Sequence, residues 1–245
     1  MDNALFVGLS RQMTLRREMD IVANNLANAD TAGFKVESLM TRPEPKAPAN
    51  TAPGPRPVKF VLDDGVVRDF DQGVLRTTGA PFDVGIEGRG FFTVNTPDGE
   101  RYTRDGRFHM DTSGKLVTEG GNTLAGDGGG EIVVDPQKGP VTISLDGVVS
   151  QGTERIGKIG VVDFPSLSVL EKTGDNLYRN TSNAQAAPKT DAVVRQGMLE
   201  SSNVNTVLEV TKMIEVNRAY QRVTEMMETT ADLSRRSIER LGRVN

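Results

Sequence analysis

The sequence predicts an α+β chain with two long terminal helices that pair as a coiled coil. A mainly antiparallel β body is inserted between them in the sequence. Residues 3–28 and 204–242 carry apolar side chains at helical spacing. The residues between them form short apolar runs bounded by glycine and proline, which is typical of strands and turns. The expected domains are an N-terminal helix over 1–34, a proline-rich extended arm over 35–72, a β-rich domain over 73–195 and a C-terminal helix over 196–245.

The N-terminal helix is predicted from a stripe of residues at alternating steps of four and three, as in the seam of a coiled coil. The stripe contains Leu5, Leu9, Gln12, Arg16, Met19, Ala23 and Leu26. We expect the helix to end near Asn28, because the residues from there to Gly33 are short and polar and favour a helix stop.

A proline-rich segment follows the first helix. Six prolines lie between Pro43 and Pro57, within fifteen positions. Proline lacks a backbone donor and cannot continue a helix, so such a segment favours extended conformations. We therefore predict a linker, or an extended arm that lies along a neighbouring molecule.

The β body is predicted from three hairpin patterns, in which turn residues such as Pro97-Asp98-Gly99 and Asp146-Gly147 separate strand-like runs. The expected pairs are 91–94 with 101–104, 107–110 with 116–117, and 141–145 with 148–149. Further strands are expected at 58–62 and over 156–164.

The C-terminal helix carries the same heptad rhythm as the N-terminal one. Its stripe contains Val210, Met213, Asn217, Tyr220, Thr224, Met227, Ala231, Ser234, Ile238 and Leu241. Ser202, Asn203 and Asn205 are candidate N-caps, and Asn217 is a polar seam residue of the kind that fixes register.

Mutually complementary helices at the two ends are suited to packing against copies of the chain or its relatives, as in a filament subunit. Helices with a single narrow apolar stripe are not stabilised by intrinsic propensity alone. We therefore expect both helices to be frayed in the isolated monomer and ordered only in the assembly.

Composition argues against several classes of function. The net charge of -4 and the lack of a basic face argue against a nucleic-acid partner. Cysteine is absent, which excludes disulfides and thiolate metal sites. No run approaches the roughly 20 apolar residues that span a bilayer, so no membrane insertion is expected. The N-terminus has Asp2 where a signal peptide would be basic, and this predicts export without a cleavable signal.

Candidates for catalysis or ligand binding are few. The single histidine, His109, is expected to be a solvent-facing strand residue and not a catalytic base. The acidic residues Asp63, Asp64, Asp69 and Asp71 could bind calcium, but they lack the ligand spacing of an EF-hand and suit turns or an edge strand. The glycine-rich segments 85–90 and 126–130 lack the features of phosphate loops and are interpreted as β turns. No catalytic, cofactor or metal site is predicted.

Four segments, read in order, resemble the flagellar rod and hook family of bacteria. They are Ala23 to Lys35, Gly73 to Phe92, Tyr102 to Phe108, and Gln196 to Asn205 with the following Met213-Ile214 and Arg218-Ala219-Tyr220. Their order and spacing cover nearly the whole chain. The chain length and the short proline-rich segment are most similar to the proximal-rod members, with the distal-rod members a close second.

The resemblance implies that the terminal helices stack with those of neighbouring subunits in the inner tube of a helical rod, with the β body outside. It implies a rod crossing the periplasm, built from copies of the chain and other rod proteins and exported through the flagellar type III apparatus, with no cofactor. The residues implied for the turn out of the first helix and the entry to the second are Asn24, Asn25, Leu26, Asn28, Gly33, Phe34, Gly197, Asn203, Val204 and Asn205. The predicted assembly interface adds Leu5, Leu9, Met19, Val210, Met213, Asn217, Tyr220, Met227 and Ile238.

The leading hypothesis is a structural subunit of the proximal rod that transmits torque and catalyses nothing. A distal-rod or hook subunit would work by the same mechanism. The alternative from another class is a secreted peptidoglycan-cleaving enzyme, which would need a pair of carboxylates in a cleft.

Overall fold

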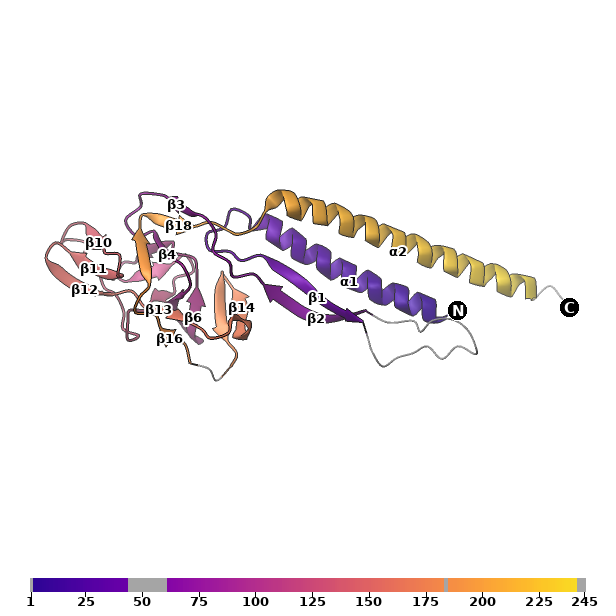
Figure 1. Ribbon diagram of the computed structural model, residues 1–245, viewed down its shortest axis with the longest axis horizontal. Coiled ribbons are helices and arrows are strands. Elements are labelled where there is room, and N and C mark those ends of the chain that lie inside the picture. Colours follow the sequence, from indigo (N-terminus) through magenta and orange to yellow (C-terminus); the bar gives the residue numbers. More distant parts are fainter. Residues whose placement is uncertain (1, 44–60, 183–184, 242–245) are drawn as a thin grey trace. The chain divides into compact units, whose positions relative to one another are not determined.

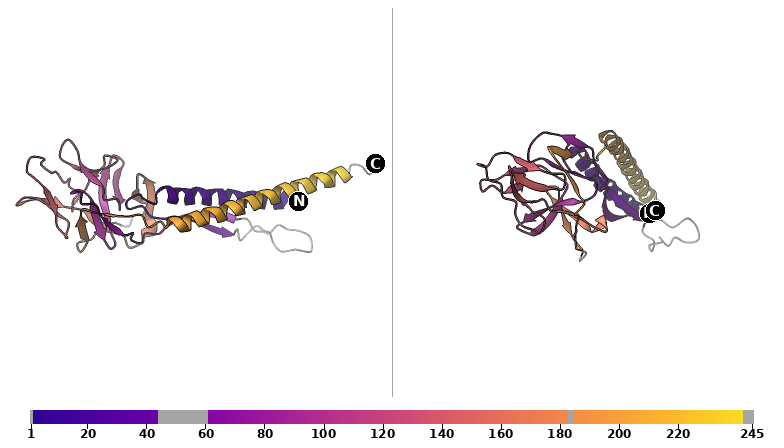
Figure 2. Two further views of the ribbon diagram at one scale, coloured as in Figure 1. Left: turned by 90° about the horizontal axis from the view of Figure 1, so that it is seen from above. Right: turned by 60° about the vertical axis from the view of Figure 1, so that its left-hand side comes forward.

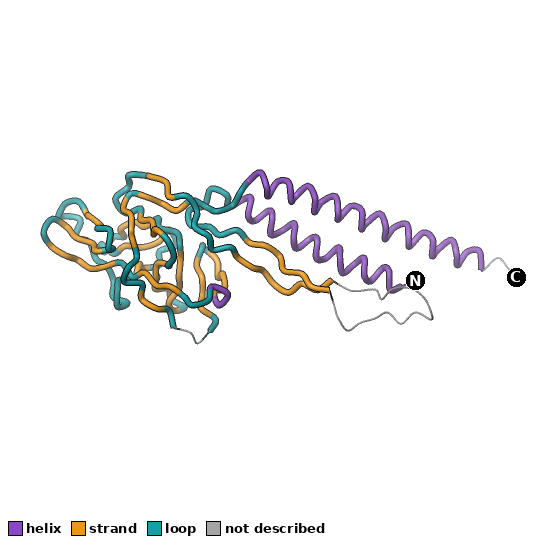
Figure 3. The backbone as a smooth tube through the Cα atoms, in the orientation of Figure 1, coloured by secondary structure: helices purple, strands orange, loops and turns teal. Residues whose placement is uncertain are grey.

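The computed structural model describes residues 2–43, 61–182 and 185–241, and these divide into two compact units (Figure 1). The helical unit takes the described residues of Met1–Ala27, Glu37–Asp69 and Val204–Asn245. The β unit takes those of Asn28–Val36 and Phe70–Asn203. Helix α1 (Asp2–Ala27) and helix α2 (Thr206–Leu241) confirm the two predicted helices. Apart from the short η1 (Leu167–Val169), the rest of the described chain is strand and loop (Figure 3).

In the helical unit, α1 and α2 lie side by side and antiparallel, as two directions of view agree (Figures 1 and 2). Gln12 Nε2 donates a hydrogen bond to Thr224 Oγ1 at 3.0 Å, and Asn25 Nδ2 donates to Glu209 Oε2 at 2.9 Å. A Cβ placed on Gly8 would lie 2.8 Å from Met227 Cγ, so glycine allows the helices to approach closely there. Residue numbers therefore rise along one helix as they fall along the other.

The seam between the helices differs in part from the predicted stripes. In α1 the buried residues include Gly8, Leu15, Val22 and Asn25, one position before the predicted Leu9, Arg16, Ala23 and Leu26. In α2 the half-buried Met213, Tyr220, Met227 and Ser234 confirm their predicted places, whereas Val210, Asn217, Ala231 and Ile238 are exposed and the buried positions are Glu209 and Val216. The prediction missed Gly8, Asn25 and Glu209 because a search for apolar spacing passes over glycine, asparagine and glutamate.

Strands β1 (Glu37–Pro43) and β2 (Val61–Arg68) form an antiparallel ribbon with a bulge between Met40 and Thr41. The ribbon lies along α1, where Ser10 Oγ donates to the Val61 carbonyl at 2.8 Å. The described part of the expected extended arm is thus a paired ribbon. Prolines 45–57, and residues 58–60 of the strand expected at 58–62, lie outside the described residues.

The β unit is built from antiparallel strands in four sheets. Its largest sheet follows the order β14-β15-β6-β5-β9-β8-β7, with β13 pairing β5 and β16; the other sheets are β10-β11-β12, β17-β4 and β18-β3. The bounds of these strands are β3 (Leu75–Thr77), β4 (Val84–Glu87), β5 (Phe91–Thr96), β6 (Gly99–Thr103), β7 (Phe108–Met110), β8 (Leu116–Thr118), β9 (Thr123–Leu124), β10 (Val141–Ile143), β11 (Val148–Gln151), β12 (Glu154–Lys158), β13 (Val161–Asp163), β14 (Leu170–Gly174), β15 (Leu177–Asn180), β16 (Ala187–Pro188), β17 (Val193–Gln196) and β18 (Met198–Glu200).

All three predicted hairpins are confirmed, as β5–β6, β7–β8 and β10–β11. The single strand expected over 156–164 is wrong, because the chain there divides into β12 and β13, which belong to different sheets. Gly160 lies at the break, and its N–H donates to the Ala125 carbonyl at 3.0 Å. That contact turns the chain from one sheet into the other.

The core of the β unit lies on both sides of β5. Phe92 and Val94 belong to the larger apolar cluster, whereas Phe91 points into a second cluster that contains Tyr102 and Tyr178. Successive side chains of a strand alternate between its faces, so a strand buried on both faces carries a continuous apolar run. This explains why β5 begins with two adjacent phenylalanines.

We predict that Phe92→Ala lowers the free energy of unfolding of the β unit by about 3–5 kcal/mol, because it empties a large buried site. Phe92 is 0% exposed, whereas Phe6 is 59% exposed and Phe6→Ala is the matched control. The control should cost no more than about 0.5 kcal/mol. Urea unfolding followed by tyrosine fluorescence measures both, since Tyr102 and Tyr178 are buried in this unit. Equal losses in the two variants would contradict the assigned core.

Candidate assembly site

The residues weighed as catalytic or metal-binding candidates have ordinary structural positions. His109 is exposed on β7, as predicted. Asp63 and Asp64 lie on β2, where Asp63 pairs with Arg17 at 2.7 Å and Asp64 with Arg42 at 3.3 Å. Within the described ranges, no group of three or more His, Asp or Glu side chains is placed to hold a metal ion.

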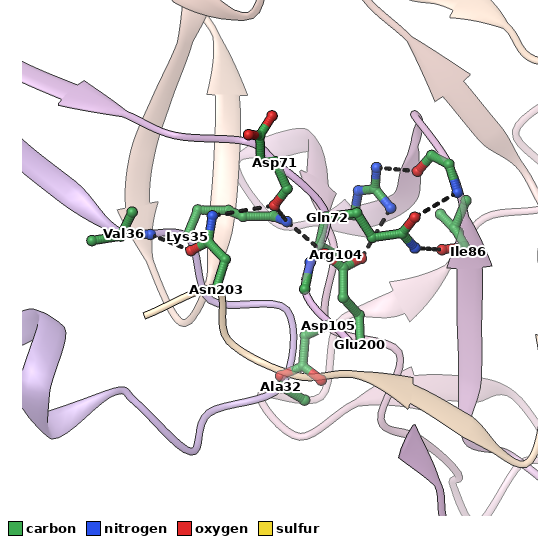
Figure 4. Close-up of polar contacts among 12 residues, drawn as sticks. Ala32, Lys35, Val36, Asp71, Gln72, Ile86, Arg104, Asp105, Glu200 and Asn203 are labelled. Atoms are coloured by element: carbon green, nitrogen blue, oxygen red, sulfur yellow. Dashed lines mark hydrogen bonds and ion pairs between the residues drawn. The ribbon is translucent and has the colours of Figure 1, made fainter. Parts of the chain in front are cut away.

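The four motif segments meet inside the β unit, around the carboxylate of Glu200 (Figure 4). Lys35 Nζ lies 2.5 Å from Glu200 Oε1, and Arg104 Nη1 lies 3.0 Å from Glu200 Oε2. The backbone N–H of Gly73 also donates to Oε1, at 3.0 Å. Each of the four motifs thus contributes one residue to a single cluster, which we call the motif junction and define as Lys35, Gly73, Arg104 and Glu200.

The charged side chains of the motif junction are excluded from water. Lys35 is 0% exposed, Glu200 1% and Arg104 4%. Burial lowers the pKa of the Arg104 guanidinium, and the charge of Glu200 opposes that shift. A buried ion pair is tolerated when further hydrogen bonds satisfy its members. Lys35 also donates to the Asp71 carbonyl at 2.7 Å, and Arg104 Nη2 donates to the Gly88 carbonyl at 2.6 Å.

Two glycines allow the backbone to approach this cluster. Gly33 has a φ of +66°, and its N–H donates to the Glu200 carbonyl at 2.7 Å. A Cβ on Gly33 would overlap the backbone of Arg104, and one on Gly73 would overlap the Ser201 carbonyl. Gly33 was expected in the turn out of the first helix, and α1 ends at Ala27, close to the predicted end at Asn28. Gly33 follows this end and fits a close contact between chain segments.

Asn203 joins two further segments to the motif junction. Its Oδ1 accepts a hydrogen bond from the Val36 N–H at 2.8 Å, and its Nδ2 donates to the Asp71 carbonyl at 3.1 Å. Figure 4 shows Asn203 beside Lys35 and Asp71. The predicted residues Gly33, Phe34 and Asn203 therefore come together. Phe34 is buried, and Lys172 Nζ lies 4.2 Å from the centroid of its ring.

Asn25 has the corresponding position in the helical unit. Besides its bond to Glu209, its Nδ2 donates to the Glu37 carbonyl at 2.8 Å and its Oδ1 accepts from the Glu37 N–H at 2.9 Å. It is fully buried and links α1, α2 and β1, whereas its predicted neighbour Asn24 is exposed. Asn25 thus makes its contacts inside the chain.

The start of α2 is fixed by Asn205, which confirms one of the predicted N-caps. Its Oδ1 accepts hydrogen bonds from Val207 N at 3.1 Å and Leu208 N at 3.2 Å.

The other predicted turn residues have defined places as well. Gly197 adopts a φ of +68° between β17 and β18, and its carbonyl accepts from the Thr78 N–H at 2.8 Å. Asn28 is the first residue after α1, and its carbonyl accepts a hydrogen bond from the Thr31 N–H at 3.1 Å. Val204 is half-buried just before the cap.

Three family descriptions match this chain along its length. "Flagella basal body rod protein" matches residues 5–35, "Flagellar hook protein FlgE/F/G D1 domain" residues 85–151, and "Flagellar basal body rod FlgEFG protein C-terminal" residues 195–240. The flagellar basal-body rod protein FlgF of Caulobacter vibrioides is 59% identical over 100% of both chains. The chain belongs to the flagellar basal-body rod protein family.

More distant rod proteins also align over nearly the whole chain. FlgF of Mesorhizobium japonicum is 34% identical over 99% of both chains. The rod protein FlgG of Bacillus subtilis is 30% identical over 94% of this chain and 96% of its own. The likeness therefore includes both terminal helices and the β unit between them.

Six of the residues predicted for the assembly interface lie along one edge of the helix pair. Gln12 and Thr224 meet there, and residues seven apart on a helix share a side. This edge, which we call the Gln12–Thr224 edge, takes in Leu5, Met19, Leu26, Val210, Asn217 and Ile238. Val210, Asn217 and Ile238 are exposed, and Leu5, Met19 and Leu26 are half-buried. Leu9, also exposed, lies one turn from Leu5. The apolar spacing did not predict the seam between the helices correctly. It identifies instead a partly exposed surface of the helix pair.

Sequence reasoning missed the motif junction. Lys35, Arg104 and Glu200 were passed over because charged side chains are normally exposed. The sequence did contain a signal, because Lys35, Arg104 and Glu200 each lie inside one of the family motifs. A charged side chain that is only solvated does not need a motif of fixed neighbours around it.

We predict that Glu200→Gln lowers the free energy of unfolding of the β unit by about 3–5 kcal/mol, because it leaves two buried cations without a carboxylate. The matched control is Glu171→Gln, which breaks an ion pair with Arg179 that is about half exposed. That pair should be worth less than about 1 kcal/mol. Denaturant unfolding measures both variants, and similar small losses would show that the junction is not needed for stability.

Proposed function

We propose that this chain is a structural subunit of the proximal part of the flagellar basal-body rod. It joins copies of itself and other rod proteins through its terminal helices, and it transmits torque without catalysing a reaction. The observation that carries the proposal is the end-to-end likeness to FlgF of Caulobacter vibrioides, at 59% identity over 100% of both chains.

The surface of the helical unit supports this role. Phe6, Leu9, Val210, Ile214 and Ile238 are all large apolar side chains exposed on α1 or α2. Exposed apolar surface of this kind favours association with another protein. A contact that joins different faces of successive subunits, and does not close, produces an open helical filament.

The route to the rod belongs to the same proposal. We expect export through the flagellar type III apparatus without a cleavable signal, followed by assembly in the periplasm. None of the helices in the described chain is both long enough and apolar enough to cross a membrane. The family match does not favour a peptidoglycan-cleaving enzyme, and a distal-rod position remains the alternative within the family.

We predict that Leu26→Asp blocks rod assembly and swimming, because it places a charge on the Gln12–Thr224 edge, while the β unit stays folded. Leu145→Asp is the matched control, since Leu145 is an exposed leucine of the β unit. Complementation of a deletion strain, scored by swimming and by isolation of basal bodies, measures both. Normal swimming with Leu26→Asp would count against helix-mediated assembly.

The position along the axis is tested by mass spectrometry of purified hook–basal bodies, with immunogold labelling of this chain. Labelling close to the inner-membrane ring is expected for a proximal-rod subunit. Labelling farther out would assign the chain to the distal rod or hook. Absence from purified particles would refute the structural role.

We also predict that amide hydrogens of α1 and α2 exchange much faster in the monomer than those of the β unit, and that assembly slows them. The seam between the helices is narrow, and long helices depend on packing for their stability. Hydrogen-exchange mass spectrometry of the monomer and of assembled particles measures the difference. Strong protection of both helices in a verified monomer would contradict this prediction.

A further inference from the structure

Residues 192–203 form the C-terminal end of the β unit, and we call them the closing strap. The closing strap contains β17, which pairs with β4, and β18, which pairs with β3 (Figure 1). Both pairs are two-stranded sheets, separate from the largest sheet of the unit. A two-stranded sheet is only marginally stable by itself in water. The closing strap therefore depends on the contacts that its side chains make.

Polar side chains fasten the closing strap at both ends. Near its start, Gln196 Nε2 donates to the carbonyls of Pro81 and Val141, at 2.8 and 2.9 Å. Gln196 Oε1 accepts from the Ile143 N–H at 3.0 Å. Near its end, the motif junction holds the carboxylate of Glu200. Hydrogen bonds and buried ion pairs replace contacts with water, so they add little net stability when they are lost together.

The closing strap contributes little to the apolar core. Of residues 192–203, all of which the structure describes, Ala192 and Val194 belong to the larger apolar cluster. The other buried members of that cluster lie between Val84 and Leu177. Hydrophobic stabilisation follows the apolar area removed from water. Lifting the closing strap therefore costs less hydrophobic free energy than unfolding the β unit.

The partners of the closing strap are distant along the chain. Glu200 binds residues 96 to 165 positions away, and Asn203 binds residues 132 and 167 positions away. The β5–β6 hairpin, in contrast, pairs Thr96 with Gly99. Bringing distant segments together costs more loop-closure entropy, so contacts of this kind form late. Synthesis begins at the N-terminus, and the closing strap is also the last part of the β unit to be made.

We propose that the closing strap docks last and opens first, in one step, while the apolar core stays folded. The motif junction makes this step all-or-none. A half-lifted strap would leave Lys35 and Arg104 buried without the Glu200 carboxylate, which is unfavourable, whereas a fully lifted strap lets water reach all three charges. Local units that open in this way do so at a lower free energy than global unfolding.

Opening the closing strap changes how the chain connects its two helices. In the closed form the Asn203 N–H donates to the Phe34 carbonyl at 3.4 Å, and Asn203 Oδ1 accepts from the Val36 N–H at 2.8 Å. Residues 34–36 follow α1, and Asn203 precedes α2. Opening therefore frees the segment that leads into α2 from the segment that leaves α1. The proposal concerns the single chain and does not depend on the rod role.

Single cysteines test the proposal in the full-length chain, which has none of its own. Val194→Cys reports on the closing strap, and Val94→Cys on β5 is the matched control, since the two valines are 1% and 0% exposed in the same cluster. Each variant is labelled with N-ethylmaleimide under native conditions, and its rate is divided by the rate in denaturant. We expect Val194→Cys to react at least tenfold faster. Its rate should also depend less on urea, because opening exposes less surface than unfolding.

Equal normalised rates at the two positions would overturn the proposal, because they would mean that the closing strap leaves only when the whole β unit unfolds. Circular dichroism first establishes that each variant is folded. If a valine variant does not fold, Ala192→Cys and Ala125→Cys take the place of the pair, since these alanines are 8% and 0% exposed.

A double variant tests whether the closing strap moves as one unit. Asn203→Ala, at the far end of the strap, is added to Val194→Cys. We expect labelling at position 194 to become at least threefold faster, whereas Glu171→Gln, added in the same way, should change the rate less than twofold. An unchanged rate with Asn203→Ala, or equal acceleration by the control, would overturn opening in one step.

Discussion

The β unit depends on one buried carboxylate, that of Glu200. Lys35, Arg104 and the Gly73 N–H all bind it, and they come from segments far apart in the sequence. A buried charge with a missing partner costs several kcal/mol, so the cluster is favourable only when all of these segments are in place. The ion cluster therefore makes folding of the β unit cooperative. A junction that lacks one of its segments leaves a buried charge without its partner, and this is less stable than having no junction at all.

The motif junction also fixes where the chain leaves the β unit. The chain passes between the two units after residues 27, 36, 69 and 203. Lys35, Asp71 and Asn203 each lie within two residues of one of these points, and they are joined by hydrogen bonds through the Asp71 carbonyl. Three of the points at which the chain leaves the β unit are therefore held together by one buried cluster.

Much of the fold follows from the sequence, because its signals are local. Both terminal helices, three hairpins and the cap at Asn205 were predicted from periodicity and turn residues, which need no knowledge of distant contacts. What failed is non-local. Residues 156–164 divide into two strands at Gly160 because a second backbone segment approaches there. The seam of α1 passes through Gly8 and Asn25 because Gly8 faces Met227 of α2, and Asn25 is hydrogen-bonded to Glu209 of α2 and Glu37 of β1. The junction of Lys35, Arg104 and Glu200 was missed for the same reason, since no local pattern marks a charge as buried.

The two units distribute charge and apolar surface in opposite ways. The β unit buries an ion cluster in addition to two apolar clusters. The helical unit instead places glycine, asparagine and glutamate in its seam and leaves Phe6, Met13 and Val207 exposed to water. Exposed apolar rows regain their hydrophobic free energy only by association.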